Sequence, residues 1–235
     1  MNTKEQKMGL SKIVADTFLK TAEVRQRFGY DSKVIGFLSN YIASNITIAS
    51  RQDFENLSIS SLNHSSQNDF SIETRDTDIW ISLDKDMAYI FRQNKVLEEE
   101  SALKDVLLGK SADSKVFVEE YVRLGFDENN EPHVLANSTY LEKTKENGIM
   151  HLNSVGLTHA TISQDGELVD ETLIEGPDSN VIEAEYLAEN CEDYEIREQL
   201  LDDISRHYEP TGKDFEKFLK TADPSAQDSG APEQN

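Results

Sequence analysis

Apolar residues in the middle of the chain change from helical spacing to strict alternation, and this change constrains the fold more than any other feature. The alternating runs form three pairs, each joined by a short polar break: 78–83 with 87–92, 115–126 with 133–139, and 158–163 with 167–174. Asp165 and Gly166 in the last break give the strongest turn signal. Consecutive hairpins predict a central antiparallel sheet and exclude a doubly wound parallel sheet, in which strands and helices alternate.

Helical periodicity appears before the hairpins and again between them. Residues 9–28 predict an amphipathic helix that ends at Gly29, and Asp31 or Ser32 could cap a second helix with apolar residues between positions 34 and 42. These two helices predict a helical hairpin. Residues 50–68 are rich in Ser and Asn, which indicates a connector with one helical turn near 52–57, and residues 96–109 predict a further helix.

The resulting expectation is an α+β chain. Its parts are a helical hairpin (1–50), a linker (51–68), an antiparallel β-rich core domain (69–176), an acidic helical region (177–220) with a break near 190–193, and a tail (221–235). The tail contains no large apolar side chain, so we expect it to be disordered.

Charge is distributed unevenly along the chain. The 235 residues contain 23 Lys and Arg and 45 Asp and Glu, a formal net charge of −22. The net charge is +3 for 1–50, −6 for 51–125 and −19 for 126–235, and 165–209 holds sixteen acids against Arg197 and Arg206. Nucleic acids and anionic lipid surfaces repel such a body, so we expect neither direct nucleic-acid binding nor membrane insertion.

The cellular compartment follows from what the sequence lacks. The longest uncharged run, 34–50, is interrupted by Ser, Asn and Thr and is too short to span a bilayer. The first residues are polar and hold no apolar signal segment, and the single cysteine, Cys191, excludes an internal disulfide. We therefore expect a cytoplasmic protein.

No common catalytic or cofactor motif occurs. The sequence has no phosphate-binding glycine loop, no dinucleotide-binding glycine turn and no nucleophile elbow. Asp127, Asn129 and Glu131 alternate as in a calcium loop, but Pro132 and Ser138 occupy the positions where such a loop needs Gly and Glu, so a hairpin turn is expected. Neither a metal nor another cofactor is predicted.

Three residues are weak candidates for catalysis: Glu120, His151 and His159. Strict alternation in 115–126 places Glu120 on the apolar face, where desolvation favours a general acid or base. The preferred alternative is a β-bulge that brings Glu119 and Glu120 to solvent. His151 and His159 could share a ligand only if the chain turned between them, and independent histidines are the default.

Two further features have structural explanations. Cys191 lies among acids that disfavour the nucleophilic thiolate, which indicates packing rather than catalysis. The basic residues of the first helix could bind a membrane or nucleic acid, but packing toward the acidic C-terminal region is preferred, within the chain or in a homo-oligomer.

The leading hypothesis is a non-catalytic protein–protein interaction protein, such as an adaptor, inhibitor or assembly component, that binds a basic protein partner. The predicted binding residues are acidic: Glu183, Glu185, Glu189, Glu192, Asp193, Glu195, Glu198, Asp202 and Asp203. One alternative is a nucleic-acid mimic that inhibits a DNA- or RNA-binding protein. Another is an enzyme of unrecognised type with a carboxylate and histidine site.

Overall fold

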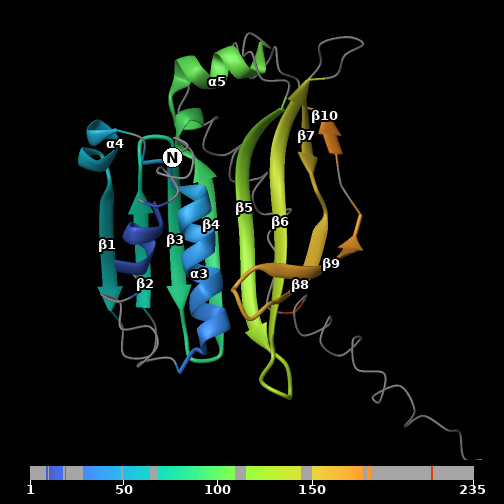
Figure 1. Ribbon diagram of the computed structural model, residues 1–235. Helices are drawn as coiled ribbons and strands as arrows, with labels where there is room; N and C mark the ends of the chain where they lie inside the picture. Colours follow the sequence, from blue (N-terminus) through green and yellow to red (C-terminus); the bar gives the residue numbers. More distant parts are fainter. Residues whose placement is uncertain are drawn as a thin grey trace, which may run out of the picture.

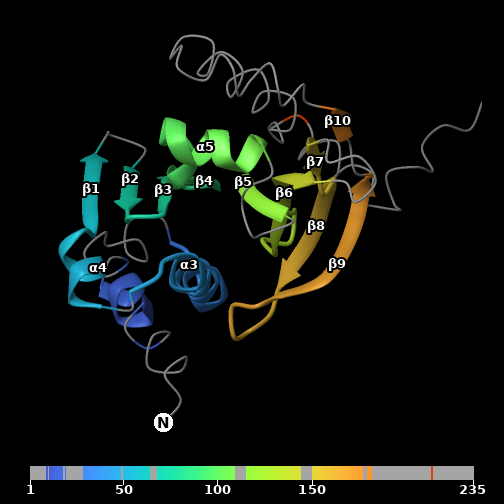
Figure 2. The same cartoon turned by 90° about the horizontal axis from the view of Figure 1, so that it is seen from above.

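The computed structural model of the chain describes residues 9, 11–17, 19, 29–48, 50–63, 68–108, 115–143, 150–176, 179–181 and 213. Their main feature is a curved antiparallel sheet with helices on one face and at one end (Figures 1 and 2). The α+β class predicted from the hairpin pattern is therefore confirmed.

Ten strands make up the sheet in the described part of the chain. They are β1 (Ser58–Asn63), β2 (Asn68–Glu73), β3 (Thr77–Leu83), β4 (Met87–Asn94), β5 (Lys115–Phe126), β6 (Pro132–Lys143), β7 (Met150–Ser154), β8 (Leu157–Ile162), β9 (Leu168–Glu175) and β10 (Ser179–Val181). Their order is β1-β2-β3-β4-β5-β6-β7-β10; β8 pairs with β6 and β9, and every pairing is antiparallel.

The three predicted hairpins are confirmed. β3 pairs with β4, β5 with β6, and β8 with β9. In the last hairpin, Gly166 has a φ of +77°, a left-handed conformation that glycine adopts without strain. The sequence signal at this turn therefore has a direct structural cause.

Helix α3 (Ser32–Asn45) begins at the predicted cap, because the Asp31 carboxylate accepts a 3.0 Å hydrogen bond from the Val34 amide. Residues 11–17 are also helical. They contact α3 and the residues after it: the Ser11 hydroxyl donates to the Ile46 carbonyl at 3.0 Å, and the Lys12 ammonium donates to Ser39 Oγ at 2.7 Å. The described residues of the helix predicted at 9–28 are therefore helical and contact α3; the rest of that helix lies outside the described residues.

The main core lies between α3 and the sheet. Figure 1 shows α3 lying across β3 and β4. Because side chains alternate along a strand, every second residue points toward α3, and these residues are mostly apolar. Members of this buried cluster include Val34, Phe37, Leu38 and Ile42 of α3, and Ile72, Ile79, Ile81, Leu83, Ile90, Val122, Leu124, Val134 and Ile162 of the sheet. Each large apolar side chain buried in this way stabilises the fold by about 1.5–3 kcal/mol.

Three shorter helices lie outside the core between α3 and the sheet. They are α4 (Arg51–Glu55), the 3-10 helix η1 (Lys95–Glu98) and α5 (Glu100–Leu107). In α4, Ser50 and Asp53 form a reciprocal capping box. The helical turn predicted near 52–57 and most of the helix predicted at 96–109 are thus confirmed.

The sheet curves until its last hairpin touches α3. Strand β6 pairs with β7 along one half and with β8 along the other, and Gly156 lies between these two partners with a φ of +89°. Figure 2 shows the β8–β9 hairpin on the α3 side of the sheet. There the Asn40 amide donates to the carbonyls of Asp165 and Gly166, both at 3.2 Å.

Some strands were not expected from the sequence. β1 lies in the stretch expected to be a connector, β7 precedes the third predicted hairpin, and β10 stands at the start of the region expected to be helical. These strands are short, with few apolar residues, so they have little periodicity. They form because an already ordered strand offers its backbone groups as partners. Apart from 179–181 and 213, the predicted acidic helices and tail lie outside the described residues.

The contact of Gly166 with α3 leads to a testable prediction. A Cβ at Gly166 would lie 2.3 Å from the backbone carbon of Gly36, whereas a Cβ at Gly29, which has a φ of +72°, meets nothing within 4 Å. We expect Gly166→Ala to lower the free energy of unfolding by about 3 kcal/mol, through backbone strain together with the clash. Gly29→Ala, the control, carries the strain alone and should cost about 1 kcal/mol. Equal losses in urea unfolding would contradict the contact.

Candidate functional site

The three candidate catalytic residues lie on three different strands: Glu120 on β5, His151 on β7 and His159 on β8. The Glu120 side chain faces α3. His159 pairs with Leu135, which alternates with the core residue Val134, so His159 lies on the opposite face of the sheet. The structure therefore does not bring Glu120 and His159 to one site.

The expected β-bulge is present, but its effect differs from the prediction. The β5–β6 register shifts between Phe117 and Glu119. Glu119 is nevertheless buried, with 6% of its surface exposed, and the Glu120 side chain is only 17% exposed. The preferred expectation that both carboxylates reach solvent is wrong. The shift lies before Glu119, and Glu119 and Glu120 point to opposite faces of the sheet because successive residues of a strand alternate.

Glu120 is the centre of a polar cluster between α3 and the sheet. Its Oε2 accepts a 2.5 Å hydrogen bond from the Tyr41 hydroxyl, and its Oε1 accepts a 2.8 Å hydrogen bond from Ser138. The Arg92 guanidinium lies 3.3 Å from the same carboxylate and is itself only 16% exposed. Both carboxylate oxygens are therefore occupied, and the charge is balanced by an adjacent cation.

Arg92 extends this cluster in two directions. One guanidinium nitrogen donates to the side-chain carbonyl of Asn45 in the last turn of α3. The guanidinium carbon lies 3.9 Å from the centre of the Phe117 ring, a cation–π contact. Its Nε is buried without a hydrogen-bond partner. Arg92 thus joins the C-terminal end of α3 to β5.

The chemistry of this cluster favours structural stability over proton transfer. Burial, followed by the Glu120 carboxylate, raises the pKa of Tyr41 well above its ordinary value, so its hydroxyl stays protonated and donates a hydrogen bond. A general base needs a free lone pair aimed at a substrate, and both Glu120 oxygens already accept hydrogen bonds from the protein. We interpret the cluster as a set of contacts that holds α3 in place against β4, β5 and β6.

A histidine pair lies on the opposite face of the sheet. His133 Nδ1 and His159 Nε2 are 2.9 Å apart, and His133 Nε2 lies 3.5 Å from a carboxylate oxygen of Asp127. His159 was expected to be independent or paired with His151, so its partner was not predicted. No sequence spacing indicates this pair, because the two residues become neighbours only through the β6–β8 register.

The electrostatics of the pair favour a neutral His159. Burial, and then the neighbouring His133, lowers the pKa of His159 below its ordinary value of 6.5. Asp127 behaves in the opposite way: burial alone would raise its pKa, but backbone N–H groups of Glu131 and Asn129, together with His133, lower it. A cationic His159 would lie with its ring nitrogen 2.9 Å from a nitrogen of His133, so a neutral imidazole suits this contact better.

Asp127 also organises the β5–β6 turn. Its carboxylate accepts hydrogen bonds from the Asn129 amide at 2.9 Å and the Glu131 amide at 2.8 Å. Asn130 has a φ of +62°, as a tight turn requires. The hairpin turn preferred over a calcium loop is thus present. Among the described residues, no group of three or more His, Cys, Asp and Glu side chains could hold a metal ion.

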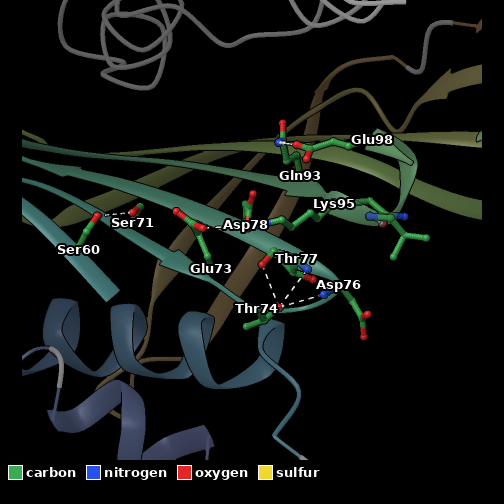
Figure 3. A network of polar contacts seen from close by, with 12 residues as sticks. Ser60, Ser71, Glu73, Thr74, Asp76, Thr77, Asp78, Gln93, Lys95 and Glu98 are labelled. Atoms are coloured by element: carbon green, nitrogen blue, oxygen red, sulfur yellow. Dashed lines mark hydrogen bonds and ion pairs between the residues drawn. The ribbon is translucent and has the colours of Figure 1, made fainter. Parts of the chain in front are cut away.

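A second polar network follows the face that carries His159 (Figure 3). The Lys95 ammonium lies 3.3 Å from Asp78 and 3.5 Å from Glu73. Burial raises the pKa of Asp78 even though Lys95 opposes this shift. Burial alone would lower the pKa of Lys95, but the carboxylates of Asp78 and Glu73 raise it. These contacts fasten η1 to β2 and β3.

Aromatic side chains lie beside this network on the same face. Trp80 stacks on Phe91 with ring centres 5.4 Å apart, and Phe91 contacts Tyr121 at 4.8 Å. Trp80 keeps 39% of its surface exposed. Cross-strand aromatic pairs of this kind stabilise a sheet.

Comparisons with known proteins return no relative: no protein-family model, no curated protein and no solved structure matches this chain. None of the described helices is long and apolar enough to cross a membrane. The nine predicted acidic binding residues and Cys191 lie outside the described residues.

The Glu120 cluster makes a prediction about stability. Glu120→Gln leaves the largely buried Arg92 cation without its counter-ion, so we expect the free energy of unfolding to fall by about 2 kcal/mol. Glu55→Gln is the matched control. It removes a carboxylate that is 57% exposed and 2.7 Å from Arg51, which is 92% exposed, and should change stability by less than about 0.5 kcal/mol. If Glu120→Gln leaves the free energy of unfolding in urea unchanged, the cluster does not hold α3 in place.

The histidine pair makes a prediction about pH. Since the pKa of His159 is lower in the folded state, its stabilising contribution is complete above pH 6.5 and is lost as the pH falls through the folded value. We expect the wild-type protein to lose stability as the pH falls below 6.5, and His159→Gln to lose less over the same range. Thermal unfolding at several pH values provides the measurement. Parallel pH profiles for the two proteins would contradict the assignment.

Proposed function

We propose that the protein is a non-catalytic protein–protein interaction protein whose acidic C-terminal surface binds a basic partner, as an adaptor, inhibitor or assembly component. The observation that carries this proposal is the charge: residues 126–235 account for −19 of the total −22. A concentrated field of one sign steers a complementary partner and raises its association rate.

The arrangement of the described polar residues supports a binding role. An acid–base site needs its groups to converge where a substrate can reach them. Glu120 instead accepts hydrogen bonds from Tyr41 and Ser138 beneath α3, and His159 contacts His133 on the other face of the sheet. Two of the three residues nominated for catalysis, Glu120 and His159, thus have structural partners.

The proposal is tested by capture of partners from native extract at low salt, followed by quantitative binding to the purified partner. Five acids of the C-terminal region are changed to their amides in one variant: Glu183, Glu189, Glu192, Glu195 and Glu198. We expect affinity to fall by about tenfold or more, and wild-type binding to weaken as salt rises, because screening shortens charge interactions to about 8 Å at physiological ionic strength.

A matched control removes the same number of charges elsewhere. It changes five exposed acids of the described region to their amides: Glu55, Asp76, Asp86, Glu99 and Glu128. We expect this variant to bind almost as tightly as the wild type. Equal losses in both variants, or binding that salt does not weaken, would overturn the role of the C-terminal surface. If the partner binds DNA or RNA and the nucleic acid competes, the protein is the mimic of the alternative hypothesis.

A further inference from the structure

The open edge of the sheet at β1 is a surface separate from the acidic C-terminal region. Among the described residues, β2 is the only strand that pairs with β1, and Figure 1 shows β1 at one end of the sheet. The outer edge of β1 therefore presents backbone N–H and C=O groups that another extended strand can bind.

The edge strands β1 and β9 differ in how they are protected. Charged side chains and register irregularities normally prevent pairing between exposed edges. β9 carries Asp170, Glu171 and Glu175, and its register with β8 is irregular at two places. The β1 sequence, Ser-Ile-Ser-Ser-Leu-Asn, contains no charged residue and no proline, and its register with β2 is continuous.

Side chains at this edge suit an added strand on both faces. Ile59 pairs with the core residue Ile72 and so lies on the α3 side, where 45% of its surface is exposed. Phe54 of the preceding helix α4 is 61% exposed. On the other face, Ser60 Oγ is 2.6 Å from Ser71 Oγ (Figure 3). An incoming strand therefore meets an apolar group on one face and a small hydroxyl on the other.

The distribution of charge indicates which incoming strand can pair with the outer edge of β1. Residues 1–50 carry +3 and residues 126–235 carry −19. In the sheet order, the strands after residue 126 lie at the end opposite β1. Two copies that meet at β1 thus keep the acidic strand β9, with Asp170, Glu171 and Glu175, away from their interface. Because β1 itself is uncharged, the edge offers no ion pair to select a charged peptide.

We propose that β1 is a self-association edge, at which two copies of the chain pair their β1 strands in antiparallel orientation and form one continuous sheet. A two-fold axis at Ser60 places Ser60 of each copy opposite the other and keeps both Ile59 side chains on the α3 side. This inference is independent of the basic partner proposed above.

Self-association of the 235-residue chain is tested by sedimentation equilibrium over a wide range of protein concentration. The mass should rise from 26.6 kDa toward twice that value. Ser60→Lys places like charges opposite each other and is expected to raise the dimer dissociation constant by about tenfold or more. Asn129→Lys, which adds the same charge on an exposed turn, should leave it unchanged. Ile59→Lys is a second edge variant.

Mixing two variants separates a lost interface from a misfolded chain. Ser60→Lys and Ser60→Glu are each expected to remain monomeric alone and to form a heterodimer together, because opposite charges then face each other across the axis. A chain that stays monomeric at all concentrations overturns the proposal. So does a dimer that Ser60→Lys and Ile59→Lys leave intact, or a mixture that gives no heterodimer.

Salt distinguishes this association from binding of the basic partner. Each copy carries −22, so salt screens the repulsion between copies, and the dimer should become stronger or stay unchanged as salt rises. A dimer that dissociates at high salt would be held by charge and would contradict pairing at β1. This outcome leaves the basic-partner proposal unaffected.

Discussion

Burial of the apolar face of α3 on the concave side of the sheet is the interaction on which the rest of the structure depends. α3 contributes Val34, Phe37, Leu38 and Ile42 to the buried core, and the sheet supplies residues from β2 to β8. A sheet that covers a helix with strands from so much of its width must curve. The split pairing of β6 with β7 and β8 accompanies that curvature and brings the final hairpin to α3.

Polar contacts hold α3 in place around this core. Tyr30, just before α3, donates a hydrogen bond to the carbonyl of Asp84 in the β3–β4 turn at 2.6 Å. Asn40 in the middle of the helix reaches the β8–β9 turn, and Tyr41 near its C-terminal end reaches Glu120. These contacts satisfy groups that burial would otherwise leave without partners, and they fix the position of the helix along the sheet.

Charge and edge protection connect the fold to the two proposed interactions. The excess negative charge belongs to the C-terminal half, whereas the uncharged β1 edge belongs to the N-terminal half. The two proposals therefore rest on different parts of the chain: the basic partner on the acidic C-terminal half and the second copy on the β1 edge. Because the two proposed associations are expected to respond to salt in opposite ways, their salt dependence tells them apart.

Local features were readable from the sequence because they depend on neighbours along the chain. Alternation and short polar breaks predicted the three hairpins, Asp31 and Ser32 marked the start of α3, and Gly166 marked a turn that needs a left-handed residue. The sequence alone also determined the uneven charge and the absence of familiar catalytic motifs.

Only the tertiary structure decided which distant residues meet. His133 and His159 become partners because β8 pairs with β6, and Glu120 and Tyr41 meet because α3 packs on β5. The sequence of β1 has weak periodicity, and that strand exists because β2 offers it backbone hydrogen bonds. In each case the arrangement is stabilised by a contact between segments far apart in the chain. A local pattern of residues cannot predict such a contact, because it holds no information about the distant partner.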